Sequence, residues 1–276
     1  MRILVLVGLM LVAMLVAQAA TVLMSSIGVD LTSRVGLLTV QAFVQILSMA
    51  VPVVLFVWIY YGTGWRDYCK VQAGGKQWGM AAVGMVLMLL VVPLTEVLTQ
   101  WNDGWQMGRV GEAMRRMQEQ TEALMDTMVK VDSIGGLLGN LLVVAVIPAV
   151  CEELLFRVGI QNQMQAWVKN RHLAVWITAI IFSLGHGEMF AFMPRLLLGA
   201  VLGYLYVYSN SLLVNTMAHF FNNACVVLLY WLAERGAIGI DPSVPMQFGW
   251  LTTLGCTLAA VMLFMVTFIS DKRVKN

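Results

Sequence analysis

Long apolar stretches separated by short polar connections dominate the chain. A helix needs about 20 apolar residues to cross a bilayer, and this criterion predicts about eight spans. They cover 3–24, 36–60, 78–99, 135–156, 173–187, 190–208, 211–232 and 249–270, of which the fifth is short. Because open strands cannot satisfy their backbone hydrogen bonds in lipid, the sequence predicts an all-α, polytopic bundle of membrane helices.

The first apolar run also has the layout of a secretion signal. Ala17-Gln18-Ala19 has the small-residue pattern of a cleavage site. The run nevertheless continues through residues 20–24, which makes it long enough to cross a membrane. We therefore expect a retained membrane helix over 3–24.

Lysine and arginine are distributed unequally between the two sets of connections. One set, together with both chain ends, holds most of them. This group is Arg2, Arg66, Lys70, Lys76, Arg157, Lys169, Arg171, Lys272, Arg273 and Lys275, and the short loops on the other side hold Arg34, Arg195 and Arg235. Because connections rich in Lys and Arg stay in the cytoplasm, the pattern predicts that both termini are cytoplasmic.

The composition excludes several other classes of protein. Hydrophobic residues make up 60% of the chain and charged residues 12%, with a mean hydropathy of +0.80, whereas soluble domains are about 25% charged. The net charge of +2 says little about partners, but no basic stretch is suited to bind nucleic acid, so we expect no nucleic-acid partner. The four cysteines show no CxxC spacing, so we expect neither a disulfide framework nor a cysteine metal site.

The connection over 100–134 is long and has a pattern of its own. Seven positions follow a 4-3 spacing with charges between them: Val110, Met114, Met117, Thr121, Leu124, Met128 and Val131. This spacing predicts a helix with one apolar stripe. We expect it to lie on the membrane surface or to pack on the bundle, with a self-pairing helix or a lid over a site as alternatives.

Polar side chains gather in the spans after residue 134. A charge at the bilayer centre costs several kcal/mol, by contested estimates from about 2.5 upward, so such groups need a partner or a function. They are Glu152, Glu153, Arg157, His186, Arg195, Asn215, His219, Asn222 and Asn223. The third histidine, His172, lies in a connection and is expected to be solvated.

Helical geometry separates the two glutamates. Adjacent side chains on a helix point about 100° apart, so Glu152 and Glu153 cannot face the same point. Glu153 precedes Arg157 by four residues, a spacing that favours an ion pair. Glu152 is then free to face the histidines. In an antiparallel hairpin turning near Asn170, Glu152 and His186 each lie about 25 Å from the turn and come level.

His219 shares one helix face with Asn223, four residues later, and with Asn215, four residues earlier. Asn222, three residues after His219, can also reach that face. His219 lies only eight residues into its predicted span. This gives it a shallower position than that of Glu152, and the spacing alone does not resolve the mismatch.

A carboxylate beside two imidazoles can activate water. Glu152 would be the general base, and His186 could hold the same water. His219 and Asn223 could donate hydrogen bonds to a developing oxyanion. The same residues also fit a polar network that locks helices together, a transporter or proton relay, or a zinc site of Glu152, His186 and His219.

Three motifs on successive spans resemble those of one protease family. "EELLFR" (Glu152–Arg157) fits EExxxR, "FSLGH" (Phe182–His186) fits FxxxH, and "HFFNN" (His219–Asn223) fits HxxxN. In this order they resemble the CPBP intramembrane protease family, also called Abi, which includes the eukaryotic CAAX prenyl endopeptidases. The resemblance covers about residues 135–232.

The resemblance implies an eight-helix fold and peptide-bond hydrolysis inside the membrane. It gives the catalytic role to Glu152 with His186, and the oxyanion role to His219 and Asn223. Supporting roles fall to Glu153, Arg157, Phe182 and Asn222. Members often have glycine directly after the arginine, whereas here Val158 precedes Gly159.

These features divide the chain into three parts. Residues 1–134 hold the first spans and the amphipathic, non-cytoplasmic connection. Residues 135–232 form the CPBP-like catalytic core. Residues 233–276 hold a loop, the last span and a basic cytoplasmic tail.

The expected function is that of an intramembrane endopeptidase acting on membrane-associated or hydrophobic peptide and protein substrates. A glutamate-activated water would do the chemistry without a cofactor, and the lipid bilayer would be the other partner. A zinc-dependent protease using the same residues, a non-catalytic immunity or scaffold protein, and a proton-coupled transporter are the alternatives. The plain, short loops favour a prokaryotic plasma-membrane protein. The sequence does not define an oligomeric state.

Overall fold

The computed structural model describes residues 2–269, so the basic tail expected within 270–276 lies outside the described residues. The described part is helical, with no strand. Its α-helices are α1 (Arg2–Ser26), α2 (Arg34–Gln45), α3 (Val51–Tyr61), α4 (Trp65–Tyr68), α5 (Gly75–Asp103), α6 (Gly108–Val129), α7 (Ile134–Asn140), α8 (Ile147–Glu153), α9 (Asn162–Val168), α10 (Arg171–Gly185), α11 (Phe192–Ser209), α12 (Leu212–Glu234) and α13 (Trp250–Phe264).

π-helical stretches continue several of these helices without a break. Within the described residues they are Ile46–Ala50, Leu141–Val146, Leu154–Gln161 and Met265–Ile269. Together with a 3₁₀ turn at Gly62–Gly64, they join α2 to α4 into one long segment, Arg34–Tyr68, and they join α7 to α9 into another, Ile134–Val168. Short π-helical stretches are often found at functional sites, and Leu154–Gln161 directly follows the two glutamates.

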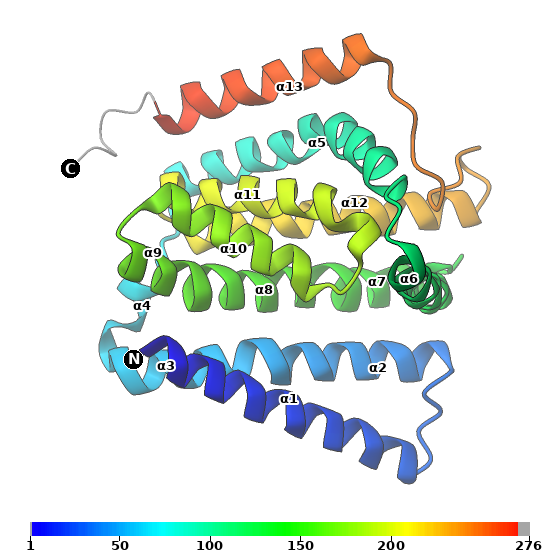
Figure 1. Cartoon of the computed structure of the whole chain (residues 1–276), viewed down its shortest axis with the longest axis horizontal. Helices are drawn as coiled ribbons and strands as arrows, with labels where there is room; N and C mark the ends of the chain where they lie inside the picture. Colours follow the sequence, from blue (N-terminus) through cyan, green and yellow to red (C-terminus); the bar gives the residue numbers. More distant parts are fainter. Residues whose placement is uncertain (1, 270–276) are drawn as a thin grey trace.

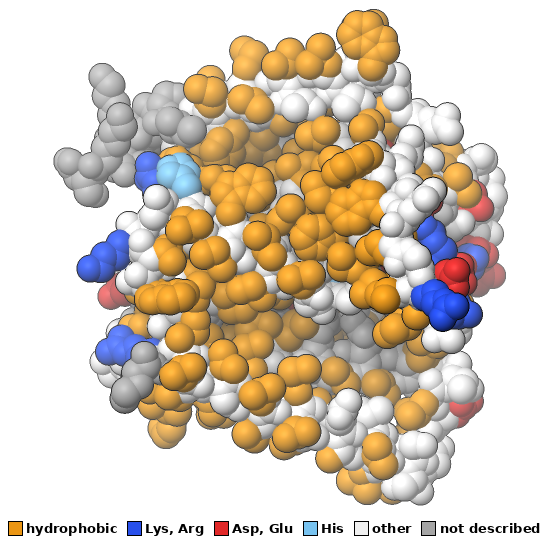
Figure 2. All heavy atoms as spheres, viewed as in Figure 1, with side chains coloured by type: hydrophobic (Ala, Val, Ile, Leu, Met, Phe, Trp, Pro, Cys, Tyr) orange, Lys and Arg blue, Asp and Glu red, His pale blue; other side chains and the backbone are white. Residues whose placement is uncertain are grey.

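Seven helical segments of the described chain are long and apolar enough to cross a membrane, and α10 is a shorter apolar helix of 15 residues. These seven segments and α10 correspond in order to the predicted spans, with α10 as the short fifth span. Figure 2 shows hydrophobic side chains covering the middle of the viewed face, with charged side chains at its two ends. The prediction of an all-α, multi-pass membrane protein is therefore confirmed.

The helices run side by side, with the site-bearing helices in the middle of the bundle (Figure 1). The α7–α9 segment, α10, α11, α12 and α5 form this central group, with α1 to α3 on one side and α13 on the other. The outer helix α13 packs on α5, and the π-helical stretch that continues it, Met265–Ile269, contacts α11. The central group contains most of the buried polar side chains.

Two glycines permit close helix contacts next to the polar core. A Cβ on Gly159 would lie 3.2 Å from a methyl of Val53 and 3.3 Å from one of Leu6. A Cβ on Gly203 would lie 2.9 Å from Val175 and 3.2 Å from the side-chain oxygen of Gln161. Gly159 thus lets α1 and α3 approach the Leu154–Gln161 stretch, although the glycine stands one position later than in the family pattern.

The helix predicted in the 100–134 connection is present as α6. It lies across one end of the bundle and is seen end-on in Figure 1. On its apolar stripe Met128 is buried, but Val110 and Met117 are 62% and 64% exposed. The stripe therefore does not pack on the bundle along its whole length, because it is buried at Met128 but exposed at Val110 and Met117. Of the expected arrangements, a membrane-surface helix, a self-pairing helix and a lid remain open.

Polar contacts hold both ends of α6 in place. Arg34 donates from Nε to the carbonyl oxygen of Met128 (3.0 Å) and from Nη2 to the side-chain oxygen of Asn140 (2.7 Å). Near the other end, Arg115 pairs with Asp103 at 2.7 Å, and its guanidinium lies 3.9 Å from the ring centroid of Phe190. The helix is thus anchored at its ends while its apolar stripe faces outward.

Candidate functional site

Glu153 is the centre of a buried polar cluster, and both of its carboxylate oxygens are hydrogen-bonded. Its carboxylate accepts hydrogen bonds from Arg157 Nε (2.8 Å), Asn215 Nδ2 (2.6 Å) and His219 Nδ1 (2.9 Å). The ion pair with Arg157 expected from the i, i+4 spacing is present. Asn215 and His219 reach the same carboxylate from α12, so Glu153 joins two helices of the core.

The π-helical stretch positions Arg157 and Gln161 toward α11. Arg157 donates from Nη1 to the side-chain oxygen of Gln161 (3.2 Å), and Gln161 donates to the carbonyl oxygen of Gly203 (3.0 Å). Arg157 has no exposed surface. Counting it among the cytoplasmic flanking cations was therefore wrong, because the helix continues inside the protein for more than two turns beyond it.

Glu152 has a different environment from that of its neighbour. It is 6% exposed, and its Oε1 accepts a hydrogen bond from Gln45 Nε2 at 3.1 Å. Its Oε2 lies 3.9 Å from Nε2 of His186 and 3.8 Å from Nε2 of His219. These separations are too long for direct hydrogen bonds, and this buried oxygen has no donor among the described protein atoms.

His186 is oriented by the backbone of its own helix. Its Nδ1 lies 2.8 Å from the carbonyl oxygen of Phe182. Because a carbonyl can only accept, Nδ1 carries the proton, and in the neutral ring Nε2 presents a lone pair. The His186 side chain is 29% exposed, which makes it the most open member of the cluster around Glu152.

Phe182 packs between the two histidines. Its ring centroid lies 4.8 Å from that of His186 and 6.2 Å from that of His219, and it also meets Phe156 edge-on at 4.9 Å. The apolar ring therefore limits how the two imidazoles can rotate. This contact gives the first position of the FxxxH motif a physical reason to be aromatic.

The shallow depth expected for His219 is wrong, because its Nε2 lies 3.8 Å from Oε2 of Glu152, at the same level of the bundle. The turn between α11 and α12 is buried at Ser209 and Ser211. Leu212 N donates to the carbonyl oxygen of Lys70 (3.1 Å), and Ser211 Oγ donates to that of Gln72 (3.2 Å). The segment after α4 thus covers this turn, and eight residues along α12 are enough to reach Glu152.

The two asparagines of the third motif have different surroundings. Both are partly buried on α12, and Asn222 Nδ2 lies 3.4 Å from Asn223 Oδ1. Asn222 lines a cavity of about 260 Å³ with Glu96 and Cys225, among other residues. Asn223 follows His219 by one turn, which keeps it on the face of α12 that carries Asn215 and His219.

Sequence reasoning missed several polar contacts of the site. Gln45 comes from α2, in a span without a motif, yet it donates to Glu152. Gln161 lies one turn beyond the EExxxR motif and extends its network to α11. Arg195, placed among the outer cations, lies on α11 and pairs with Glu188 at 2.5 Å, with its Nη1 buried. A glutamine inside the apolar run of α2 was the one signal that pointed to Gln45.

The residues considered for zinc can be tested by their arrangement. Within the described part of the chain, no three or more His, Cys, Asp or Glu side chains are grouped as a metal-ion site. Glu152 Oε2 does face both imidazoles, at 3.8–3.9 Å. These donors are of the kind that zinc uses, so metal dependence is a question for experiment.

Comparisons with known proteins bear on the same part of the chain. No curated protein and no solved structure matches the chain. Residues 134–225, about a third of the 276 residues, match the family model described as Rce1-like, type II CAAX prenyl endopeptidase Rce1-like. This match covers all three motifs and confirms the resemblance drawn from them: the protein is a multi-pass membrane protein in which residues 134–225 are similar to the Rce1-like, CAAX protease-like family.

Proposed function

We propose that this protein is an intramembrane endopeptidase in which Glu152 activates water. The observation that carries the proposal is the contrast between the two glutamates. Glu153 is saturated by three protein donors, whereas Oε2 of Glu152 is buried, has no protein donor, and faces two imidazole nitrogens. A water beside Oε2 could bond to the carboxylate and to an imidazole.

The proposed reaction follows from these atoms. Glu152 Oε2 takes a proton from the water, while the lone pair of His186 Nε2 accepts a hydrogen bond from its second proton. The water oxygen attacks the carbonyl carbon and forms a C–O bond, leaving an oxyanion. The C–N bond then breaks, and the proton on Glu152 passes to the leaving amine.

His219 and Asn223 are the proposed donors to the oxyanion. His219 Nδ1 is held by Glu153, so its Nε2 is fixed toward Glu152. When Nε2 also carries a proton, the ring is positively charged, and the carboxylate of Glu153 balances that charge. The Asn223 amide adds a neutral donor on the same helix face.

The proposed substrates are apolar, lipid-flanked peptide or protein segments. The site lies among helices whose outer faces are hydrophobic, so a substrate must reach it from lipid or along the exposed edge of His186. The proposed location is the plasma membrane of a prokaryote, with the Lys- and Arg-rich end in the cytoplasm.

Cleavage by purified protein tests the proposal directly. In liposomes, the protein is expected to cut quenched apolar peptides and to incorporate one oxygen from ¹⁸O water into the new carboxyl terminus. The activity should survive slow removal of metal ions with a chelator, because a carboxylate base needs no metal. Stoichiometric zinc that restores lost activity would instead establish a metalloprotease. If the wild-type protein transports a solute and cleaves no peptide, the transporter alternative is favoured. If it shows neither activity, the non-catalytic scaffold is favoured.

Loss of the Asn223 amide gives a more local prediction. Asn223→Ala is expected to lower kcat by about 10²–10³ with little change in KM, because the donor acts on charge that develops in the transition state. Asn222→Ala is the matched control, since it removes the neighbouring amide, which lines a different cavity. Equal kinetics for the two variants would remove Asn223 from the oxyanion site.

A further inference from the structure

A polar cavity of about 430 Å³ lies where α5 begins and α11 ends. This is the end of the bundle that the charge distribution assigns to the cytoplasm. Among the described residues, its lining includes Lys70, Lys76 and Arg171, with amide and hydroxyl groups from Gln72 and Ser209, among others, and no acidic residue. The cavity therefore concentrates positive charge beside groups that can donate hydrogen bonds.

Two of these cations are held on aromatic rings. Lys70 Nζ lies 4.1 Å from the ring centroid of Tyr206, and the Arg171 guanidinium lies 5.1 Å from that of Tyr208. Among the described residues, no carboxylate lies within ion-pairing distance of Lys70 or Arg171. The backbone of Lys70 has a φ of 54°, an unfavourable value for lysine, and burial lowers its pKa to about 8. A half-buried cation of this kind is stabilised by an anion.

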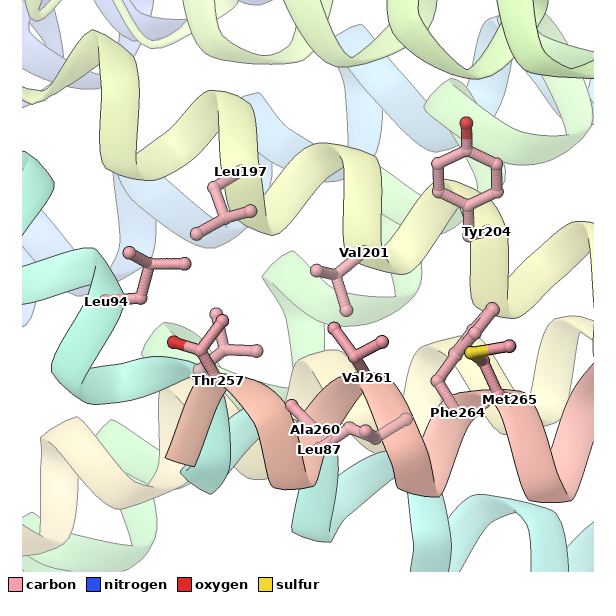
Figure 3. Close-up of a pocket in the computed structure, with 11 residues that line it drawn as sticks. Leu87, Leu94, Leu197, Val201, Tyr204, Thr257, Ala260, Val261, Phe264 and Met265 are labelled. Carbon is pink, nitrogen blue, oxygen red and sulfur yellow. The ribbon is translucent and has the colours of Figure 1, made fainter. Parts of the chain in front are cut away.

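An apolar cavity of about 350 Å³ lies between α5, α11 and α13 (Figure 3). Its lining includes Leu87 and Val91 from α5, Val201 and Tyr204 from α11, and Phe264 from α13. Aliphatic and aromatic side chains make up nearly all of this surface, which matches a hydrocarbon chain rather than a polar ligand.

The two cavities lie along the same faces of the same helices. On α5, Lys76 and Met80 line the polar cavity, and Leu87 and Val91 line the apolar one at helical spacings of four and seven residues. The same holds for α11, where one helix face carries Tyr208, which lines the polar cavity. That face also carries Tyr204, Val201 and Leu197, which line the apolar cavity.

The distance between the cavities suits a single amphipathic molecule. Four residues separate Tyr208 from Tyr204, and seven separate Met80 from Leu87, which corresponds to about 6–10 Å along the helices. The ring centroids of Tyr208 and Phe264 are 5.5 Å apart, so α13 contacts α11 at the point where the two cavities meet. A charged head and an apolar chain a few ångströms apart are the features of a phospholipid.

We propose that the α5–α11–α13 groove is a binding site for an anionic phospholipid, with its phosphate beside Lys70 and Arg171 and an acyl chain between α11 and α13. Basic pockets between membrane helices on the cytoplasmic side are suited to acidic head groups. The guanidinium of Arg171 can bind a phosphate through two N–H groups. This site is distinct from the Glu152 cluster, and the proposal does not depend on the proteolytic reaction.

Lipid retention by the purified full chain tests the proposal. Phosphatidylglycerol is expected to raise the unfolding temperature in detergent and to stay bound in native mass spectra, whereas phosphatidylcholine with the same acyl chains does neither. Arg171→Gln and Lys70→Gln should each weaken phosphatidylglycerol binding about fivefold. Lys169→Gln is the matched control, because it removes an exposed cation next to the cavity. Unfolding temperatures without lipid show whether each variant is folded.

Several outcomes would overturn the proposal. Equal binding of phosphatidylcholine, or equal weakening by Lys169→Gln, would leave only non-specific lipid contact. Inorganic phosphate that stabilises the protein as strongly as phosphatidylglycerol would limit the site to a free anion. Binding of an acidic peptide in place of the lipid would indicate a protein partner. Lipid binding that appears only after removal of residues 270–276 would indicate that these residues, rather than a lipid, occupy the groove.

Discussion

Glu152→Gln is expected to lower the turnover of a cleavable peptide by about 10²–10⁴ while the protein stays folded. The amide has the same shape, and its oxygen can still accept the hydrogen bond that Gln45 gives to Oε1. It cannot take a proton from water. The group facing His186 and His219 becomes an NH₂ donor, which suits neither a base nor a water site. Peptide cleavage and thermal unfolding, measured on the same preparation, check both parts.

Gln45 offers a graded control for this prediction. Gln45→Leu removes the contact with Oε1 but leaves the carboxylate and both histidines in place. We expect a smaller loss of turnover than for Glu152→Gln, because Gln45 positions the base and takes no part in the bond changes. Wild-type cleavage by Glu152→Gln would rule out the proposed base.

The spans and the local pairs could be predicted because they depend on short-range patterns. Hydropathy alone fixes which segments enter a membrane, and each predicted span has its helix in the structure. The Glu153–Arg157 pair depends only on the i, i+4 geometry of one helix. The opposite orientation of Glu152 follows from the same geometry.

Contacts between distant segments could not be predicted in the same way. Gln45 and Glu152 are 107 positions apart, and no local pattern indicates that α2 passes beside α8. The depth of His219 depends on the buried turn at Ser209 and Ser211, which is covered by a segment of remote sequence. Amphipathicity predicts that α6 is a helix, but it does not specify what its apolar stripe contacts.

Glu153→Gln is expected to destabilise the protein by about 3–5 kcal/mol, because it leaves Arg157 as an uncompensated buried charge. Neither side chain has exposed surface, and the Nε–Oε2 distance is 2.8 Å. The variant also replaces the carboxylate that binds Asn215 and His219 with a neutral amide. Unfolding in mixed detergent micelles measures the loss, and Glu152→Gln should stay close to wild type in the same assay.

A double variant separates the charge effect from the loss of shape. Adding Arg157→Met to Glu153→Gln removes the unpaired cation, and the large cost of breaking a buried ion pair comes from the charge that is left uncompensated. The double variant should therefore recover much of the lost stability. It should not recover turnover, because the imidazole of His219 would still lack the carboxylate that fixes its Nδ1 proton. A Glu153→Gln variant as stable as wild type would show that the pair does not anchor the core. Recovery of stability and turnover together would place the function of Glu153 in packing rather than in orienting His219.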